Sequence, residues 1–179
     1  MARYAAFLRA INVGGHTVKM ADLRASFDAL GFDEVETFIA SGNVIFDSSE
    51  SDEGKLERVI ERALEAEFGY PVETFVRSMG ELAEIAGRDP FERADPGSDA
   101  RSVYVAFLDR RPTAEAVRRL TDLATENDTF AVVGREAWWL RRGGIGTSRF
   151  SGGLLEKTLG MPATLRGLPT VTKIVAKHG

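Results

Sequence analysis

The chain lacks cysteine altogether, and only two of its 179 residues are histidine, His16 and His178. Without cysteine it has no disulfides and no thiolate metal sites, and two distant histidines give no recognisable metal-binding spacing. Neither the phosphate-binding pattern G-x-x-x-x-G-K-[ST] nor the dinucleotide-binding pattern G-x-G-x-x-G occurs. No apolar run is long enough to span a bilayer, and no signal-peptide pattern opens the chain. We therefore expect a cytoplasmic protein with no metal, no cofactor and no membrane partner.

The composition is that of a globular protein with an uneven distribution of charge. Hydrophobic residues make up 44% and charged residues 28% of the chain, which is sufficient for a core. Residues 1–100 carry 10 basic and 20 acidic side chains, whereas residues 101–179 carry 13 basic and 7 acidic ones. Either the basic half attracts the acidic half, or it faces a polyanion. The first interpretation needs no outside partner.

Both halves of the chain show the same order of predicted elements. Apolar runs at 4–8 and 104–108 open the halves as strands, and helical periodicity follows each of them. The first half is predicted to contain strands at 4–8, 35–40, 44–46 and 72–77 and helices at 20–30, 56–68 and 79–87. The second half is predicted to contain strands at 104–108, 129–133, 136–140 and 163–166 and helices at 113–123, 150–159 and 170–177. The last helix has a strand alternative, because Val171, Lys173 and Val175 also alternate along the chain.

This repeated β-α-β-β-α-β-α order predicts an α+β protein made by tandem duplication of a ferredoxin-like sandwich, with one extra helix in each half. We expect an acidic N-terminal domain at 1–90 and a basic C-terminal domain at 101–179. The polar segment 91–100 is the predicted linker between them. Each domain should have a four-stranded antiparallel sheet with two helices on one face. The other face is either open or covered by the other half.

A glycine pair lies in the loop between the first strand and the first helix, among polar side chains. The loop carries Arg9, Asn12, Gly14, Gly15 and Lys19. Backbone N–H groups in such a loop, close to a helix N-terminus, can form an anion-binding site. The alternative is plain turn chemistry, because glycine adopts positive φ at little cost. Both interpretations remain open at this point.

Two segments carry a resemblance to a known family. Residues 8–15 read LRAINVGG and residues 41–46 read SGNVIF. The pair resembles the LRGINVGG and SGNVVF signature of an uncharacterised bacterial family, domain of unknown function 1697. The resemblance implies a pair of ferredoxin-like domains and no established activity. Ala10 replaces the glycine of the family, so we expect a negative φ there, and residues 164–168 read TLRGL where the family usually has Thr-Arg-Asn-Trp.

The turn Ser41-Gly42-Asn43 has the composition of a tight hairpin between two strands. In a sharper interpretation, Ser41 and Asn43 line a ligand pocket at the same end of the sheet. From the ferredoxin-like order we expect this turn and the glycine loop to lie at opposite ends of the sheet. That placement argues against one pocket that holds both.

A second glycine-rich basic cluster lies in the segment 141–149. It contains Arg141, Gly146, Ser148 and Arg149, and it leads into a helix that either Ser148 or Ser151 should cap. Arginines, hydroxyls and flexible glycines suit a phosphate group. A basic surface loop that balances the acidic half is an equally good explanation.

Catalytic residues are few. His16 is the one candidate acid or base, because His178 stands at a C-terminus expected to fray. Trp138 and Trp139 are adjacent on a strand, so their rings should point to opposite faces, and one of them is a candidate base-stacking surface. An RNA-binding RNP1 pattern is missing, so burial between the domains is the better interpretation.

Three functional hypotheses follow. The leading one is non-enzymatic binding of a phosphate-bearing ligand, a nucleotide or nucleic acid, through the two glycine-basic loops. The second is an enzyme that acts on a phosphorylated small molecule, with His16 or Lys19 as the acid or base. The third is a structural or interaction protein, which includes the possibility of a homodimer.

Overall fold

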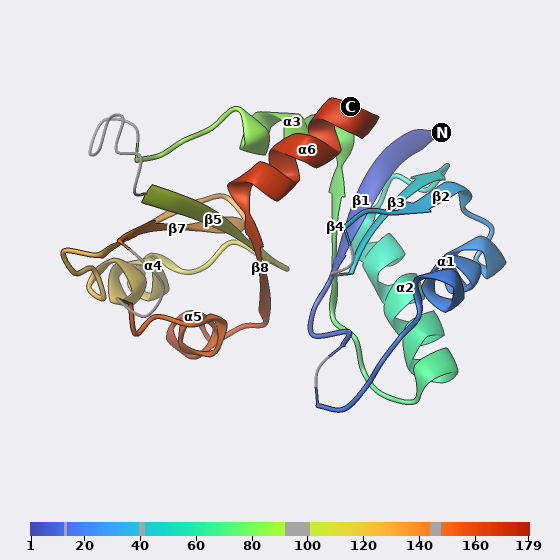
Figure 1. Ribbon diagram of the computed structural model, residues 1–179, viewed down its shortest axis with the longest axis horizontal. Coiled ribbons are helices and arrows are strands. Elements are labelled where there is room, and N and C mark those ends of the chain that lie inside the picture. Colours follow the sequence, from blue (N-terminus) through green and yellow to red (C-terminus); the bar gives the residue numbers. More distant parts are fainter. Residues whose placement is uncertain (13, 40–41, 92–100, 144–147) are drawn as a thin grey trace. The chain divides into compact units, whose positions relative to one another are not determined.

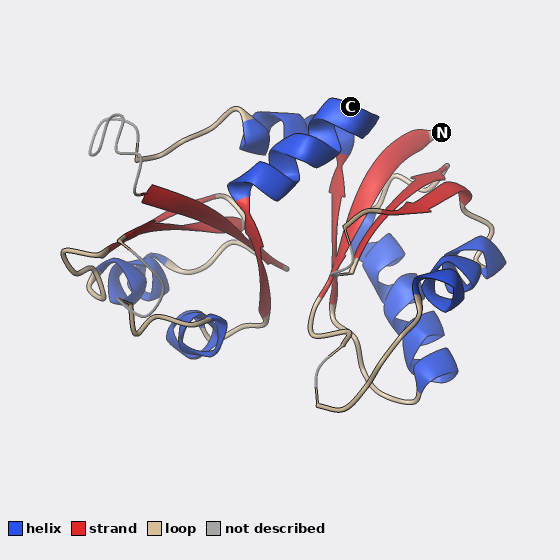
Figure 2. Cartoon of the chain, in the orientation of Figure 1, coloured by secondary structure: helices blue, strands red, loops and turns tan. Residues whose placement is uncertain are grey.

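The computed structural model describes residues 1–12, 14–39, 42–91, 101–143 and 148–179. It contains two four-stranded antiparallel sheets with strand orders β2-β3-β1-β4 and β6-β7-β5-β8 (Figure 1). The second order is the first one shifted by four strands, so the two halves share one topology. Two helices of each half pack on one face of its sheet and form the core there (Figure 2). The predicted fold, two ferredoxin-like α+β halves in tandem, is confirmed.

The N-terminal half is built around a sheet with β1 and β3 at its centre. Its elements are β1 (Ala2–Leu8), α1 (Met20–Ala29), β2 (Asp33–Thr37), β3 (Asn43–Ser48), α2 (Glu53–Phe68), β4 (Thr74–Ser78) and α3 (Met79–Ala86). Asp52 caps α2 by accepting a hydrogen bond from the N–H of Lys55 at 3.0 Å, and Gly69 ends it with a φ of 82°. Apolar residues of α1 and α2, including Phe27 and Ile60, form the core against this sheet.

Strand β2 differs from the predicted strand at 35–40. It begins at Asp33 and ends at Thr37, and its pairing with β3 is irregular between Asp33 and Glu36. Glu34 has a φ of 48° at this irregularity. A bulge inserts an extra residue that interrupts the two-residue alternation of a strand, so periodicity alone did not predict where β2 begins and ends.

The C-terminal half repeats the plan with its own core. Its elements are β5 (Arg101–Leu108), α4 (Ala114–Thr121), β6 (Asp128–Val133), β7 (Glu136–Arg142), α5 (Gly152–Leu159), β8 (Ala163–Gly167) and α6 (Leu168–His178). Thr113 caps α4, and Ser151 caps α5 by accepting from the N–H of Leu154 at 3.2 Å. Of the two serines predicted as possible caps of α5, Ser151 is therefore the N-cap residue.

Residue contacts divide the chain into two compact units. One contains Met1–Glu84 together with Ile174–Gly179, and the other contains Ile85–Lys173. The predicted domains were 1–90 and 101–179, whereas the C-terminal unit begins at Ile85 and the last residues of α6 belong to the N-terminal unit. Residues 92–100 of the predicted linker lie outside the described residues.

The end of α6 is held by side-chain contacts within the N-terminal unit. Lys177 forms an ion pair with Glu36, and the ring of His178 meets that of Phe38 edge-on at 5.7 Å. The side chain of His178 is only 5% exposed. The expectation that this residue frays is wrong, because contacts distant in sequence hold the last turn in place. The helical alternative for 170–177 is correct and the strand alternative is not.

The two tryptophans of β7 point to opposite faces, as the strand period predicts. Trp139 belongs to the core beneath α4 and α5 and stacks on Tyr104 with a centroid distance of 4.8 Å. Trp138 lies on the other face and is 1% exposed. Since both indoles are buried, neither offers an open surface for base stacking.

Candidate functional site

The glycine loop and the Ser41-Gly42-Asn43 turn lie together at one end of the N-terminal sheet. The N–H of Leu8 donates to the carbonyl of Gly42 at 2.8 Å. A Cβ at Gly42 would lie 3.1 Å from side-chain atoms of both Leu8 and Ile11. The expectation of opposite ends is wrong because β1 ends beside the start of its antiparallel neighbour β3, with Phe7 opposite Asn43. The residues Ala40 and Ser41 of this turn lie outside the described residues.

Polar groups within the glycine loop hold the loop itself. The Asn12 side-chain oxygen accepts from the N–H of Val18 at 2.8 Å. The His16 ring stacks on Tyr70 with centroids 3.9 Å apart and planes at 21°. The Tyr70 hydroxyl donates to the carbonyl of Ile11 at 2.7 Å, and burial raises the pKa of this phenol. Asn12 and His16 thus have structural partners in addition to the ligand or catalytic roles considered for them.

Several residues at this end of the sheet have left-handed backbone conformations. Gly14 and Gly15 have φ values of 66° and 82°, as expected for glycines in a turn. Ala10 has a φ of 53° and Ile39 one of 52°, although side chains disfavour this region. The expectation of a negative φ at Ala10 is wrong. Hydrogen bonds from the N–H groups of Leu8 and Arg9 fix the chain just before Ala10, so tertiary pairing overrides its local preference.

The cations of the glycine loop differ in their partners. Arg9 donates to the Glu73 carboxylate at 2.9 Å, and both side chains are more than one-third exposed. Lys19 precedes α1 as its N-cap residue, makes no side-chain capping bond and has no ion pair among the described residues. Lys19 is therefore the predicted cation of this loop that is available to an anion.

The second basic cluster divides into a buried part and an exposed part. Arg141 lies over the rings of Tyr104 and Trp139, at 5.5 and 5.9 Å from their centroids. Ser148 donates to Asp128 at 2.8 Å and accepts from the N–H of Phe150 at 3.1 Å. Gly146 lies outside the described residues. The cluster therefore contains one arginine fixed on aromatic rings and one serine fixed on a carboxylate.

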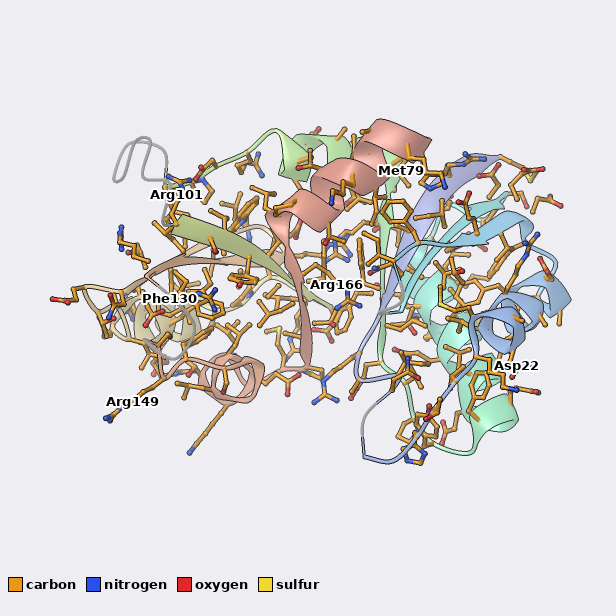
Figure 3. The ribbon with its side chains drawn as sticks, in the orientation of Figure 1. Asp22, Met79, Arg101, Phe130, Arg149 and Arg166 are labelled. Carbon is orange, nitrogen blue, oxygen red and sulfur yellow. The ribbon has the colours of Figure 1, made fainter. Side chains whose placement is uncertain are left out.

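Arg149 is exposed and lines a pocket of about 290 Å³. Figure 3 shows its side chain extending away from the ribbon of the C-terminal unit. The pocket is also lined by Leu123, Thr125, Asn127, Asp128, Phe150 and Leu154. A neighbouring pocket of about 390 Å³ shares two of these residues, Leu123 and Leu154, and adds Arg119, Asp122, Lys157 and Thr158. Two cations, Arg149 and Lys157, thus flank one stretch of apolar surface.

Asp128 organises the wall of the Arg149 pocket, and sequence reasoning missed it. It is 5% exposed and accepts hydrogen bonds from the Trp139 indole at 2.8 Å, from Ser148 at 2.8 Å and from the Thr125 hydroxyl at 3.2 Å. An aspartate at the start of an amphipathic strand has no distinctive local pattern. The pairing of β6 with β7 places Asp128 opposite Arg141, and only this pairing brings its carboxylate within reach of the Trp139 indole.

A further pocket, of about 680 Å³, lies in the same unit and was also missed by sequence reasoning. It is formed by the beginning of β5, the end of β8 and the first turns of α6, and Asp89 also lines it. Its lining comes from residues more than 80 positions apart in the chain. Only the pairing of β5 with β8 brings them together.

Each half contains an arginine at the same position of its last sheet strand, fully buried at Arg77 and half-buried at Arg166. Arg77 on β4 lies opposite Ala5, and Arg166 on β8 lies opposite Val105. Arg77 donates to the carbonyl of Val76 at 2.8 Å, and Arg166 donates to Thr164 and Leu165 at 2.7 and 2.9 Å. Burial lowers the pKa of Arg166 to about 10. This shared feature supports the duplication independently of the strand order.

The fold and these sites define a class, namely α+β proteins made of two ferredoxin-like units. Among the described residues, no cluster of three or more histidines and carboxylates could hold a metal, and no helix is long and apolar enough to cross a membrane. A family model described as "Protein of unknown function (DUF1697)" matches residues 1–138. The chain therefore belongs to this family, as its two signature segments indicated.

A solved structure shares the whole fold. It is described as the structure of conserved bacterial protein SP0830 from Streptococcus pneumoniae, and it matches with a TM-score of 0.74 at 22% identity. The match covers 98% of this chain and 97% of the other. No functionally curated protein matches the sequence. At this level of identity, the likeness concerns the fold alone.

Proposed function

We propose that the protein binds a phosphate-bearing ligand without transforming it, and that the Arg149 pocket of the C-terminal unit is the site. The observation that carries this proposal is an exposed guanidinium, with no ion pair among the described residues, at the edge of a pocket of about 290 Å³. A guanidinium without a carboxylate partner is a strong donor for phosphate oxygens.

The other groups of the pocket suit the same ligand. The Thr125 hydroxyl and the Asn127 amide lie on the polar side, and Phe150 and Leu154 lie on the apolar side. This combination of an anion-binding end and an apolar wall is typical of a site for a phosphate group attached to an organic body. The Asp128 carboxylate already accepts three hydrogen bonds, so its role here is to hold the wall.

The adjoining pocket extends the site toward a second cation. Lys157 lines it and forms no ion pair with a described residue, whereas Arg119 lies 3.4 Å from the carboxylate of Glu115. A nucleotide, with phosphates at one end and a flat base at the other, has the length and polarity for such a site. A nucleic acid strand is the larger ligand of the same chemistry.

The test is a calorimetric titration of the wild-type protein with pyrophosphate and with adenosine nucleotides. The Arg149→Gln variant should bind roughly 10 to 100 times more weakly, because a charged hydrogen bond contributes about 1.5–3 kcal/mol. Arg110→Gln is the matched control, since Arg110 is an exposed arginine of the same unit whose partner is Asp109. Equal affinity of the Arg149 variant and the wild-type protein would refute the site.

The stability of an Arg149→Ala variant provides a second test. Arg149 lies just before the N-terminus of α5, where a cation is unfavourable by a few tenths of a kcal/mol or more. In phosphate-free buffer the variant should therefore be as stable as the wild-type protein or slightly more stable. A clearly lower melting temperature would instead assign Arg149 a structural ion pair, and the anion site would have to be abandoned.

The nucleic-acid version of the proposal has its own signature. Binding of a single-stranded oligonucleotide releases counterions, so its affinity should fall steeply as the salt concentration rises. The enzyme hypothesis is less well supported by the geometry, because the His16 ring lies flat against Tyr70. Turnover of a phosphorylated substrate by the wild-type protein, with loss of that activity in His16→Ala, would favour the enzyme hypothesis instead.

A further inference from the structure

We propose that the pocket of about 680 Å³ at the start of α6 is a second ligand site, and that it binds an organic monocarboxylate with an apolar body. Every residue that lines it lies between 89 and 173, within the C-terminal unit. It shares no lining residue with the Arg149 pocket. This inference is therefore independent of the proposed function, and each site can fail without the other.

The dimensions and walls of this pocket suit a small organic molecule. Binding pockets for such ligands commonly measure about 300–1,000 Å³ and are mainly apolar with a few polar groups. Here Val103, Leu168 and Pro169 supply aliphatic surface. Tyr104 borders the pocket along β5, while its ring packs on Trp139 in the core on the other face of the strand. Gly167 contributes no side chain, so the floor between the strand and the helix stays open.

The net charge of the lining residues indicates which class of ligand the pocket binds. Arg101 is only 15% exposed and forms an ion pair with Asp89, so these two lining residues neutralise each other. Lys173 is exposed and has no ion pair among the described residues. The pocket thus has one surplus positive charge, which matches a ligand with a single negative charge. A phosphate monoester, with nearly two negative charges at neutral pH, fits this site less well.

The ammonium group of Lys173 is the donor on the polar side of the pocket, and two hydroxyl-bearing residues border it. Ser102 lies on β5, and Thr172 lies on α6 one residue before Lys173. The Thr172 hydroxyl donates its proton to the carbonyl of Leu168 at 3.0 Å, so toward a ligand it acts as an acceptor. A carboxylate near Lys173 would accept hydrogen bonds from its ammonium group, and the apolar body would lie against Val103, Leu168 and Pro169.

The experiment uses the full chain and pairs of probes that differ only in charge. Each of 2-naphthoate, indole-3-acetate and octanoate is titrated beside its neutral amide, and binding is followed by calorimetry and by ligand-observed NMR. The wild-type protein should bind at least one acid about tenfold more tightly than its amide. Failure to bind any of the three acids would overturn the proposal.

Three variants locate the binding. Lys173→Gln should weaken the acid about tenfold and leave the amide unchanged, because only the acid uses the charge. Gly167→Leu should fill the floor and abolish binding of both probes. We expect this variant to fold, because Gly167 has an ordinary φ and a Cβ there would meet only Pro169, at 3.6 Å. Its circular dichroism spectrum checks that expectation. Lys157→Gln is the matched control and should bind like the wild-type protein.

The outcomes also separate this site from the Arg149 pocket. Arg149→Gln should keep the affinity for the acid, and Lys173→Gln should keep the affinity for pyrophosphate. An acid whose binding is lost equally in Lys173→Gln and Lys157→Gln would reveal nonspecific attraction to the basic unit. A folded Gly167→Leu variant that still binds the acid would place it elsewhere. Either result would overturn the proposal.

Discussion

Replacement of Ala10 by glycine should stabilise the protein. Ala10 is exposed and has a φ of 53°, in the region that side chains disfavour. A left-handed conformation costs an L-residue about 1–2 kcal/mol, and glycine avoids this cost. Glycine also gives the unfolded chain more freedom, which removes about 0.4–1 kcal/mol of the gain. The free energy of unfolding of Ala10→Gly should therefore exceed that of the wild-type protein by about 0.5–1 kcal/mol.

The assay is urea unfolding followed by circular dichroism, supported by the melting temperature. A gain of this size should raise the melting temperature of a chain of this length by about 1–4 °C. The matched control is Ala25→Gly, because Ala25 is an exposed alanine inside α1. Glycine in a helix interior costs about 1 kcal/mol, so the same substitution should destabilise there. A loss of stability in both variants would refute the left-handed conformation of Ala10.

Three further predictions concern packing, pH and one hydrogen bond. A Cβ at Gly42, where φ is 79°, would lie 3.1 Å from two neighbouring side chains, whereas one at Gly15 would have nothing within 4 Å. Gly42→Ala should therefore lose about 2–4 kcal/mol and Gly15→Ala about 1–2 kcal/mol by urea unfolding, and equal losses would contradict the close packing. Burial lowers the pKa of His178, although the nearby Glu36 carboxylate opposes this shift. The unfolded state therefore binds the proton more readily than the folded state. As a result, the free energy of unfolding falls as the pH drops below the ordinary pKa of histidine. Between about pH 7 and 5 the wild-type protein should lose more stability than His178→Gln, and parallel pH curves would exclude this role. Tyr70→Phe removes a 2.7 Å hydrogen bond to a loop carbonyl and should cost about 0.5–1.5 kcal/mol of thermal stability, while unchanged stability would show that the bond contributes nothing.

The candidate sites were only partly accessible to sequence reasoning. The segment 141–149 was recognised as basic and rich in glycine, and Arg149 does line a pocket. Asp128 was not recognised, because a single aspartate at a strand start matches many surface positions. Lys173 was noted only as part of the predicted element at 170–177, since nothing local indicates that the first turns of α6 lie beside the start of β5. Pockets form between distant segments, and sequence spacing does not measure such distances.

The sequence also misled in three places, each for a physical reason. At Ala10 the local preference for negative φ gave way to hydrogen bonds that fix the preceding residues. At His178 the usual fraying of a terminus gave way to contacts with Glu36 and Phe38. The turn at Gly42 was expected at the opposite end of the sheet from the glycine loop. Because β1 ends where the antiparallel strand β3 begins, Gly42 instead lies in contact with Leu8.

The sequence by itself determined the order of helices and strands, the duplication and the family. Helical and strand periods are local properties, and the elements repeat in the same order in both halves, so they can be read without knowledge of packing. The tertiary structure alone decided that the loop after β1 meets the turn before β3, that the end of α6 joins the N-terminal unit, and where the pockets form. These features depend on contacts between residues tens of positions apart, and chain topology sets those contacts.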